Sequence, residues 1–476
     1  MSTELRYVCA GLLLLLAACS DDKPSTADQQ ALELEAAGQI PASEQRSGDA
    51  EQGRHALLNE AYVECGLPAR IWRETGFGDG VPSLAAREGK GKDFPYFLNQ
   101  TVNSDGVELV VNNCLTCHGS SLFGDVVIGL GNEFADFTAD PSIAVERAGL
   151  LVQGEAETAA WELYADRVAA FAPYVRMHTV GSNPANNLTF ALIAHRDPVT
   201  NEWSDTPLGP LPSTEPPPVS VPPWWRMQKK HAMFNLGEGR GDHARLMMSA
   251  SMMCTDDRES LEAIDQYAPD IRAFIASLEA PLWPFDIDQT RARQGKAIFE
   301  NTCSRCHGTY GGDEEHYPNL LVDINVIGTD SALMDQARDN GGPWVAWFNT
   351  SYYGELTEAR PGNGYVAPPL DGIWATGPYL HNGSVPNLEQ VLDSTSRPVL
   401  WIHNARDGND PGSFDTVGVG WLHKTPDFGD MDSLPPQERK RVYDTRRYGH
   451  GNTGHTFGDH LTHEERKAVI EYLKTL

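Results

Sequence analysis

Apolar residues recur at helical spacing in two segments, one near the middle of the chain and one at its end. The spacing i, i+3, i+4, i+7 predicts an amphipathic helix over 270–279, with a stripe formed by Ile271, Phe274, Ile275 and Leu278. An approximate repeat of this spacing at the end of the chain predicts a C-terminal helix, with a stripe formed by Val469, Ile470, Leu473 and Leu476. The sequence Thr462-His-Glu-Glu465 is a capping box that starts this last helix.

A weak internal repeat places the same pattern before two cysteine pairs. Gly106-Val-Glu-Leu-Val-Val-Asn-Asn-Cys114 runs parallel to Gly295-Lys-Ala-Ile-Phe-Glu-Asn-Thr-Cys303. Because an apolar pair lies one helical turn after each Gly, we expect an amphipathic helix in front of each cysteine pair.

Between these segments the chain is rich in Gly, Pro and polar residues. The stretch 210–223 holds seven prolines and cannot form the interior of a helix. Such long loops favour small helical domains that wrap a large apolar cofactor. The segment Ala280-Pro-Leu-Trp-Pro-Phe-Asp286 is the natural linker, which predicts one domain over 54–285 and a second over 286–476.

The N-terminus has the features of an export signal. Residues 7–18 form an apolar run too short for a lasting membrane span. The run ends in Leu16-Ala-Ala-Cys19, which resembles a bacterial lipobox, so we expect residues 1–19 to be a lipoprotein signal and Cys19 to carry lipid. An ordinary cleaved signal is the alternative, and both place the protein in the periplasm. Residues 20–53 lack a sustained pattern and are expected to be a flexible tether.

The net charge of −29 changes which partners are expected. An acidic surface disfavours nucleic acid and anionic membrane, and it attracts a small basic protein. Solubility alone is the other explanation of the charge.

Two cysteine pairs are each followed by histidine, in Cys114-Leu-Thr-Cys117-His118 and Cys303-Ser-Arg-Cys306-His307. In this motif both thiols bond to haem and the histidine becomes the proximal iron ligand. A zinc site or a redox dithiol would not explain the two histidines. We therefore expect two covalent haems c, in a mainly α fold of two c-type cytochrome domains. Cys65 and Cys254 remain and are expected to form a disulfide in an oxidising compartment.

The segment from Ala367 to Leu388, with Gly-Ile-Trp-Ala-Thr-Gly-Pro-Tyr-Leu-His381-Asn-Gly-Ser-Val, resembles a signature of the bacterial di-haem cytochrome c peroxidase superfamily. The residues of this segment most resemble those of the rubber-oxygenase-like branch. There the C-terminal haem has a second histidine ligand just before the closing helix. By that resemblance His455 is the expected ligand, His450 is the alternative, and Met431 lies too early.

For the first haem, the resemblance makes His178 a displaceable ligand or a distal hydrogen-bond donor, and it gives His381 a structural role beside a haem. Trp224 or Trp225 is expected to relay electrons between the haems, although both fit ordinary packing. Phe234 belongs to the same candidate catalytic segment, in which His231 and His243 are further histidines. Basic residues there are expected to neutralise haem propionates; they are Arg226, Lys229, Lys230 and Arg240.

The peroxidases also bind calcium between domains. By resemblance its ligands would be Asn187 or Asn183 and the carbonyls of Thr376 and Pro378. Peroxide reduction at the first haem, with electrons from a basic cytochrome or cupredoxin, is the leading expectation for function. A dioxygenase reaction on an apolar alkene is the alternative, and a non-catalytic two-haem electron carrier is the second.

Overall fold

The computed structural model describes residues 31–75, 84, 87, 89–312, 315–427, 431 and 433–476. Its α-helices are α1 Ala50–Asn59, α2 Ala69–Thr75, α3 Leu115–His118, α4 Pro141–Gly149, α5 Gly154–Phe171, α6 Ala185–Ala194, α7 His243–Met247, α8 Arg258–Asp265, α9 Ala268–Ala276, α10 Gln289–Thr302, α11 Ser304–His307, α12 Ile324–Ile327, α13 Ala332–Asn340, α14 Gly342–Thr350, α15 Leu388–Leu392, α16 Pro436–Arg439 and α17 His463–Leu473. Within the described ranges, no helix combines the length and the apolar character needed to cross a membrane.

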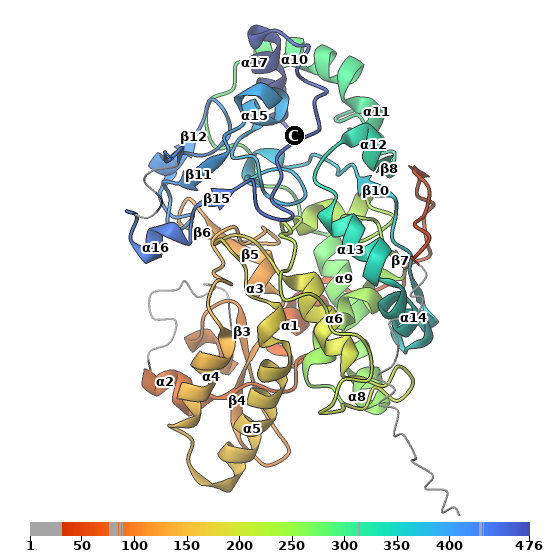
Figure 1. Cartoon of the computed structure of the whole chain (residues 1–476), viewed down its shortest axis with the longest axis vertical. Helices are drawn as coiled ribbons and strands as arrows, with labels where there is room; N and C mark the ends of the chain where they lie inside the picture. The colour runs from red at the N-terminus through yellow and green to blue at the C-terminus, as the bar shows by residue number, and fades with distance from the viewer. Residues whose placement is uncertain are drawn as a thin grey trace, which may run out of the picture.

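Both closing helices form as expected. The predicted helix over 270–279 is α9, and the C-terminal helix is α17, whose capping box joins Thr462 and Glu465 in both directions. Each packs across an earlier helix, α1 against α9 and α10 against α17, and the second pair stands together at one end of the molecule (Figure 1).

A glycine allows each crossing. A Cβ atom added to Gly53 of α1 would lie 1.8 Å from the Asp270 carbonyl oxygen, and one added to Gly295 of α10 would lie 1.8 Å from the Ala468 carbonyl oxygen. No side chain fits in such a space, so the two backbones meet directly.

Replacing Gly295 by Ala is expected to lower the free energy of unfolding by about 1–3 kcal/mol, because α10 and α17 must separate to admit a methyl group. Denaturant unfolding followed by circular dichroism measures the change. Gly38→Ala is the control, since a Cβ there meets nothing within 4 Å. Equal unfolding midpoints for the two variants would contradict the direct backbone contact.

The predicted helix in front of Cys114 is wrong. Residues Glu108–Asn112 form strand β4, which pairs with β3 (Leu98–Val102) on one side and β2 (Leu67–Pro68) on the other. Gly106 has a φ of +79° and lies in the turn between β3 and β4. Partners on both sides satisfy the backbone of this Val-rich run, and β-branched residues favour that outcome. The true counterpart of Gly295-Lys-Ala-Ile-Phe-Glu-Asn301 is Gly53-Arg-His-Ala-Leu-Leu-Asn59 of α1.

Strands occur in both halves of the described chain. The sheets have the orders β1-β8-β10, β14-β11-β15, β12-β13, β2-β4-β3, β5-β6 and β7-β9. Their remaining members are β1 Gly38–Gln39, β5 Gly119–Leu122, β6 Asp125–Ile128, β7 Gly239–Gly241, β8 Leu320–Asp323, β9 Thr357–Ala359, β10 Gly364–Val366, β11 Leu400–His403, β12 Phe414–Asp415, β13 Gly420–Trp421, β14 His423–Lys424 and β15 Tyr443–Asp444.

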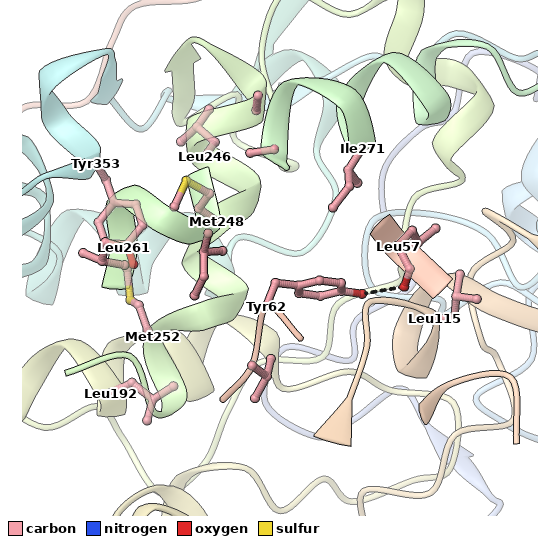
Figure 2. Packing of buried hydrophobic residues seen from close by; sticks show 14 of the residues in the cluster. Leu57, Tyr62, Leu115, Leu192, Leu246, Met248, Met252, Leu261, Ile271 and Tyr353 are labelled. Carbon is pink, nitrogen blue, oxygen red and sulfur yellow. Dashed lines mark hydrogen bonds between the residues drawn. The ribbon is translucent and has the colours of Figure 1, made fainter. Parts of the chain in front are cut away.

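Each of the two main hydrophobic cores contains residues from both the N-terminal and the C-terminal half of the chain. The larger core joins Leu57, Leu115 and Ile271 with Tyr353 and the α14 residue Phe348 from the C-terminal half, and Figure 2 shows Tyr353 beside Leu261 and Met252. The second core contains Leu122, Leu130 and Trp225 from the N-terminal half. The prediction of a mainly α fold with two c-type cytochrome domains is therefore wrong, because small sheets occur throughout and each half lends side chains to the other's core.

The tether interpretation is also wrong for residues 31–53. Strand β1 pairs with β8, and Arg46 donates to the carboxylates of Asp242 and Asp265 at 2.7–3.1 Å. Charge-assisted bonds of this kind hold the segment on the fold. The predicted signal and Cys19 lie outside the described residues.

Candidate functional site

Both cysteine motifs adopt the same short turn, α3 in the first and α11 in the second. The backbone N–H of His118 donates to the Cys114 carbonyl at 3.0 Å, and that of His307 donates to the Cys303 carbonyl at 3.1 Å. The two thiols of each motif lie close enough to act on each other's pKa. All four thiols are free and partly buried, which leaves them available for thioether bonds.

A zinc site finds little support in the structure. Burial raises the pKa of Cys114 to about 11 and that of Cys303 to about 12, so both thiols are protonated at pH 7. Among the described residues, no three His, Cys, Asp or Glu side chains converge as a metal site.

The second motif has an imidazole opposite its histidine. Nδ1 of His307 donates to the Pro368 carbonyl at 2.8 Å, which leaves Nε2 for a metal. The ring centres of His307 and His455 are 6.1 Å apart. Two imidazoles that bind one iron through bonds of about 2 Å have ring centres about 6 Å apart, so the pair fits a six-coordinate haem iron.

The protonation state of this pair also suits a metal. Burial lowers the pKa of His307, and it lowers that of His455 to about 4, with His307 adding to the effect. Both rings are therefore neutral at pH 7, which is the form that binds a metal.

The first motif has different surroundings. Burial lowers the pKa of His118 to about 4, and the Pro222 carbonyl opposes the shift. The ring stacked on His118 is Trp224, with centres 4.8 Å apart and planes at 22°. In the described part of the chain, no imidazole pairs with His118 as His455 does with His307.

His178 and His450 lie together, away from both proximal histidines. Their ring centres are 6.1 Å apart. Nδ1 of His178 accepts from Arg447 at 3.0 Å and its Nε2 contacts Glu215 at 3.3 Å, so both nitrogens have partners. The structure thus brings His455 beside His307, and among the described ring contacts it brings neither His178 to His118 nor His450 to His307.

A short helix, η3 (Trp224–Lys229), connects the two motifs. Trp224 stacks on His118 and belongs to the larger core, whereas Trp225 belongs to the second core. Trp225 Nε1 and Arg226 Nε both donate to the Asp371 carbonyl, at 2.8 and 2.9 Å. The charge of Arg226 lowers the pKa of His307, so one end of this helix stacks on His118 and the helix also carries a charge that acts on His307.

The predicted propionate partners divide into two groups. Arg240 is paired with Glu35, and Lys229 bonds Glu315 and Asp371. Arg226 and Lys230 form no ion pair in the described structure, and burial lowers the pKa of Arg226 to about 10 and that of Lys230 to about 8. A buried cation that has no ion pair gains most from an anionic partner. Arg226 and Lys230 therefore suit propionates better than Arg240 and Lys229 do.

The remaining histidines and the phenylalanine of the predicted site have separate surroundings. The ring of His381 stacks on Tyr365 with centres 3.9 Å apart, His231 Nδ1 contacts the Ile40 carbonyl, and Phe234 is 39% exposed. His243 is buried, and neither ring nitrogen makes a hydrogen bond of normal geometry.

The calcium ligands stay a prediction. The Asn187 amide donates to the Ser213 carbonyl, and its oxygen accepts from Gln336. The Thr376 hydroxyl donates to the Ile373 carbonyl. Asn187 would therefore exchange the Gln336 bond for a bond to the ion.

The predicted disulfide is confirmed, with Cys65 bonded to Cys254. The prolines that accompany the two proximal histidines were not predicted from the sequence. The Pro368 carbonyl accepts from His307, and the Pro222 carbonyl acts on the pKa of His118. Each of these two prolines begins a Pro-Pro pair followed by an apolar residue, Trp224 or Leu370. That repeated tripeptide was the available signal.

Comparison with known proteins supports the haem interpretation of the second half. Residues 364–402 match the family described as RoxA-like, cytochrome c-like. This match implies haem c and indicates a haem oxidoreductase related to the rubber-oxygenase branch.

Two curated relatives come from Sinorhizobium fredii. The uncharacterized protein y4iM is 30% identical over 244 residues, which are 42% of this chain and 52% of that protein. The uncharacterized protein y4iJ is 28% identical over 265 residues, which are 42% of this chain and 41% of that protein. The chain thus spans about half the length of these relatives, or less.

Proposed function

We propose that this protein is an exported two-haem oxidoreductase that reduces peroxide at the haem held by Cys114, Cys117 and His118. The unequal surroundings of the proximal histidines carry the proposal. His307 faces His455 at 6.1 Å, whereas His118 has the Trp224 ring beside it. A filled sixth position favours electron transfer, and an open one favours chemistry.

When bound, haem c supplies iron that exchanges single electrons and binds small oxygen species at an open position. The residues of the chain divide the remaining work. His307 and His455 hold the electron-storing centre, and Trp224 and Arg226 of η3 join it to His118. Arg226 and Lys230 offer positive charge to propionates.

A dioxygenase reaction on an apolar alkene is the second candidate. The match of residues 364–402 to the RoxA-like family favours it. In that case no outside electrons are needed, and the bridge through η3 serves structure alone.

The experiment uses the haem-loaded full-length protein. Haem staining after denaturing electrophoresis, with quantification of iron, tests for two covalent haems. Stopped-flow mixing with peroxide and a reduced small cytochrome is expected to oxidise that cytochrome, whereas oxygen uptake with polyisoprene and no donor would favour the dioxygenase. Two low-spin haems that bind neither cyanide nor peroxide would contradict both and leave an electron carrier.

The location and the donor belong to the same proposal. We propose a periplasmic protein held to the membrane by lipid on Cys19, with a small basic cytochrome or cupredoxin as donor. The net charge of −29 supports the choice of a basic partner.

A further inference from the structure

One arginine holds the loop that carries His455, residues 449–455, called the His455 loop below. Arg397 is half-buried, and each of the five N–H donors of its guanidinium bonds a main-chain carbonyl. Three of these carbonyls belong to the His455 loop, and they are those of Asn452 at 2.7 Å, Gly454 at 2.6 Å and His455 at 3.2 Å. The other two belong to α15, and they are those of Gln390 at 2.9 Å and Val391 at 3.2 Å. Arg397 therefore ties the His455 loop to a helix with every donor that it has.

The guanidinium of Arg397 has carbonyl partners in place of a carboxylate. Among the described side chains, no Asp or Glu forms an ion pair with it, although Asp393 and Asp459 lie near enough to act on its pKa. Asp393 pairs with Arg466, and Asp459 accepts from the N–H and the hydroxyl of Ser394 at 2.8 and 2.6 Å. The charge of Arg397 therefore strengthens its bonds to the carbonyls. Removing the guanidinium would leave those carbonyls without these partners.

The backbone of His455 has a conformation that needs support. Its φ is +47°, which is disfavoured for a residue with a Cβ atom. Its N–H donates to the Ile327 carbonyl at 2.7 Å, and its own carbonyl accepts from Arg397. Both polar groups of its main chain are therefore bonded to parts of the fold that are distant in sequence.

The ring of His455 lacks the bond that orients its partner ring. Nδ1 of His307 donates to the Pro368 carbonyl at 2.8 Å, whereas Nδ1 of His455 is buried and makes no hydrogen bond of normal geometry. A hydrogen bond on the second ring nitrogen usually fixes the orientation of an imidazole that binds a metal. Because His455 has none, the position of its ring depends on how firmly its backbone is held.

We propose that Arg397 is a positioning residue, which fixes the backbone of His455 so that the imidazole stays opposite His307. This inference rests on the proposed function, in which the second haem stores electrons and the first one reacts. A histidine that is held in place keeps the sixth position of the second iron closed to small oxygen species. Arg397 therefore contributes to deciding which of the two haems is reactive.

Cyanide binding to the haem-loaded full-length protein tests the hold on His455. Arg397→Met is expected to weaken the bond of His455 to the iron about 10–100-fold, as the loss of an outer partner of a metal ligand does. The cyanide concentration that replaces the low-spin paramagnetic resonance signal of the two-histidine haem is expected to fall by the same factor. Arg397→Lys keeps the charge but presents its donors from a single atom, so it is expected to lie between.

Arg466→Lys is the matched control. Arg466 is also half-buried, but its bonds go to Asp393 and to the carbonyls of Gly458 and Asp459, outside the His455 loop. Its cyanide titration is expected to match that of wild type. Ethylguanidinium added to Arg397→Ala is expected to restore part of the cyanide resistance, because it can occupy the space of the missing group. Ethylammonium at the same concentration is expected to have no effect.

Three results would overturn the role of Arg397. The first is a wild-type cyanide titration in both Arg397→Met and Arg397→Lys. The second is an equal weakening in Arg397→Met and Arg466→Lys, which would show a general loss of stability. The third is an Arg397→Ala variant that responds to ethylammonium as it does to ethylguanidinium. If circular dichroism and haem staining show that Arg397→Met does not fold, Arg397→Lys decides, and a wild-type titration would contradict the inference.

The other failures are distinguishable. A second haem that stays low-spin in His455→Asn would remove the ligand on which the inference rests. A wild type that consumes no peroxide would overturn the proposed function and leave the role of Arg397 in place, since none of these titrations uses peroxide.

Discussion

Replacing His455 by Asn is expected to change the second haem from low-spin to high-spin and to reduce donor oxidation about 10–100-fold or more. His455 is the imidazole whose ring centre lies 6.1 Å from that of His307. Its φ is +47°, and Asn tolerates this conformation without providing an iron ligand of comparable strength. The backbone bond from its N–H to the Ile327 carbonyl can therefore remain.

Electron paramagnetic resonance and optical spectra of the purified protein measure the change. His460→Asn is the matched control, because His460 is exposed and lies five residues away. His450→Asn tests the alternative ligand. A low-spin second haem in His455→Asn, together with a high-spin one in His450→Asn, would reverse the assignment.

Removing the disulfide is expected to lower the free energy of unfolding by about 4–5 kcal/mol. Cys65 and Cys254 are separated by 189 residues, and a crosslink over so long a loop greatly restricts the unfolded chain. The bond also fixes the segment after α1 to the end of η4 (Met248–Met253), and both cysteines are buried.

Guanidinium unfolding of the Cys65→Ala, Cys254→Ala double variant measures this loss. Wild-type protein treated with a reductant is expected to unfold at the midpoint of the variant, whereas the variant itself is expected to ignore the reductant. Midpoints that agree for oxidised wild type and variant would mean that tertiary packing already provides the constraint.

The shared cores give the two proximal histidines different neighbours, although the turns of their motifs are alike. Trp224 and Trp225 are adjacent in sequence but enter different cores. One ring lies against His118, and the other is held by the Asp371 carbonyl beside Gly372. Under the proposed function, this connection would keep the two haems at a fixed separation for electron transfer.

The elements predicted correctly have short-range causes. Helices α9 and α17 follow from a sustained apolar stripe, and the capping box of α17 closes within four residues. The disulfide followed from counting cysteines in a protein expected to be exported.

The errors have long-range causes. The run before Cys114 shares its Gly and apolar pair with the run before Cys303, yet it became β4 because β2 and β3 flank it. The segment 31–53 has no periodic pattern, and its order comes from partners such as β8 and Asp242, which are distant in sequence.

The histidines show which features the sequence alone predicts and which only the tertiary structure reveals. The sequence by itself predicted the attachment cysteines and the proximal ligands, His118 and His307, because each motif lies within five residues. Only the tertiary structure showed which histidines come together, since His455 meets His307 and His450 meets His178. Residues so far apart along the chain come together through packing of the whole fold, and neither spacing nor composition encodes that packing.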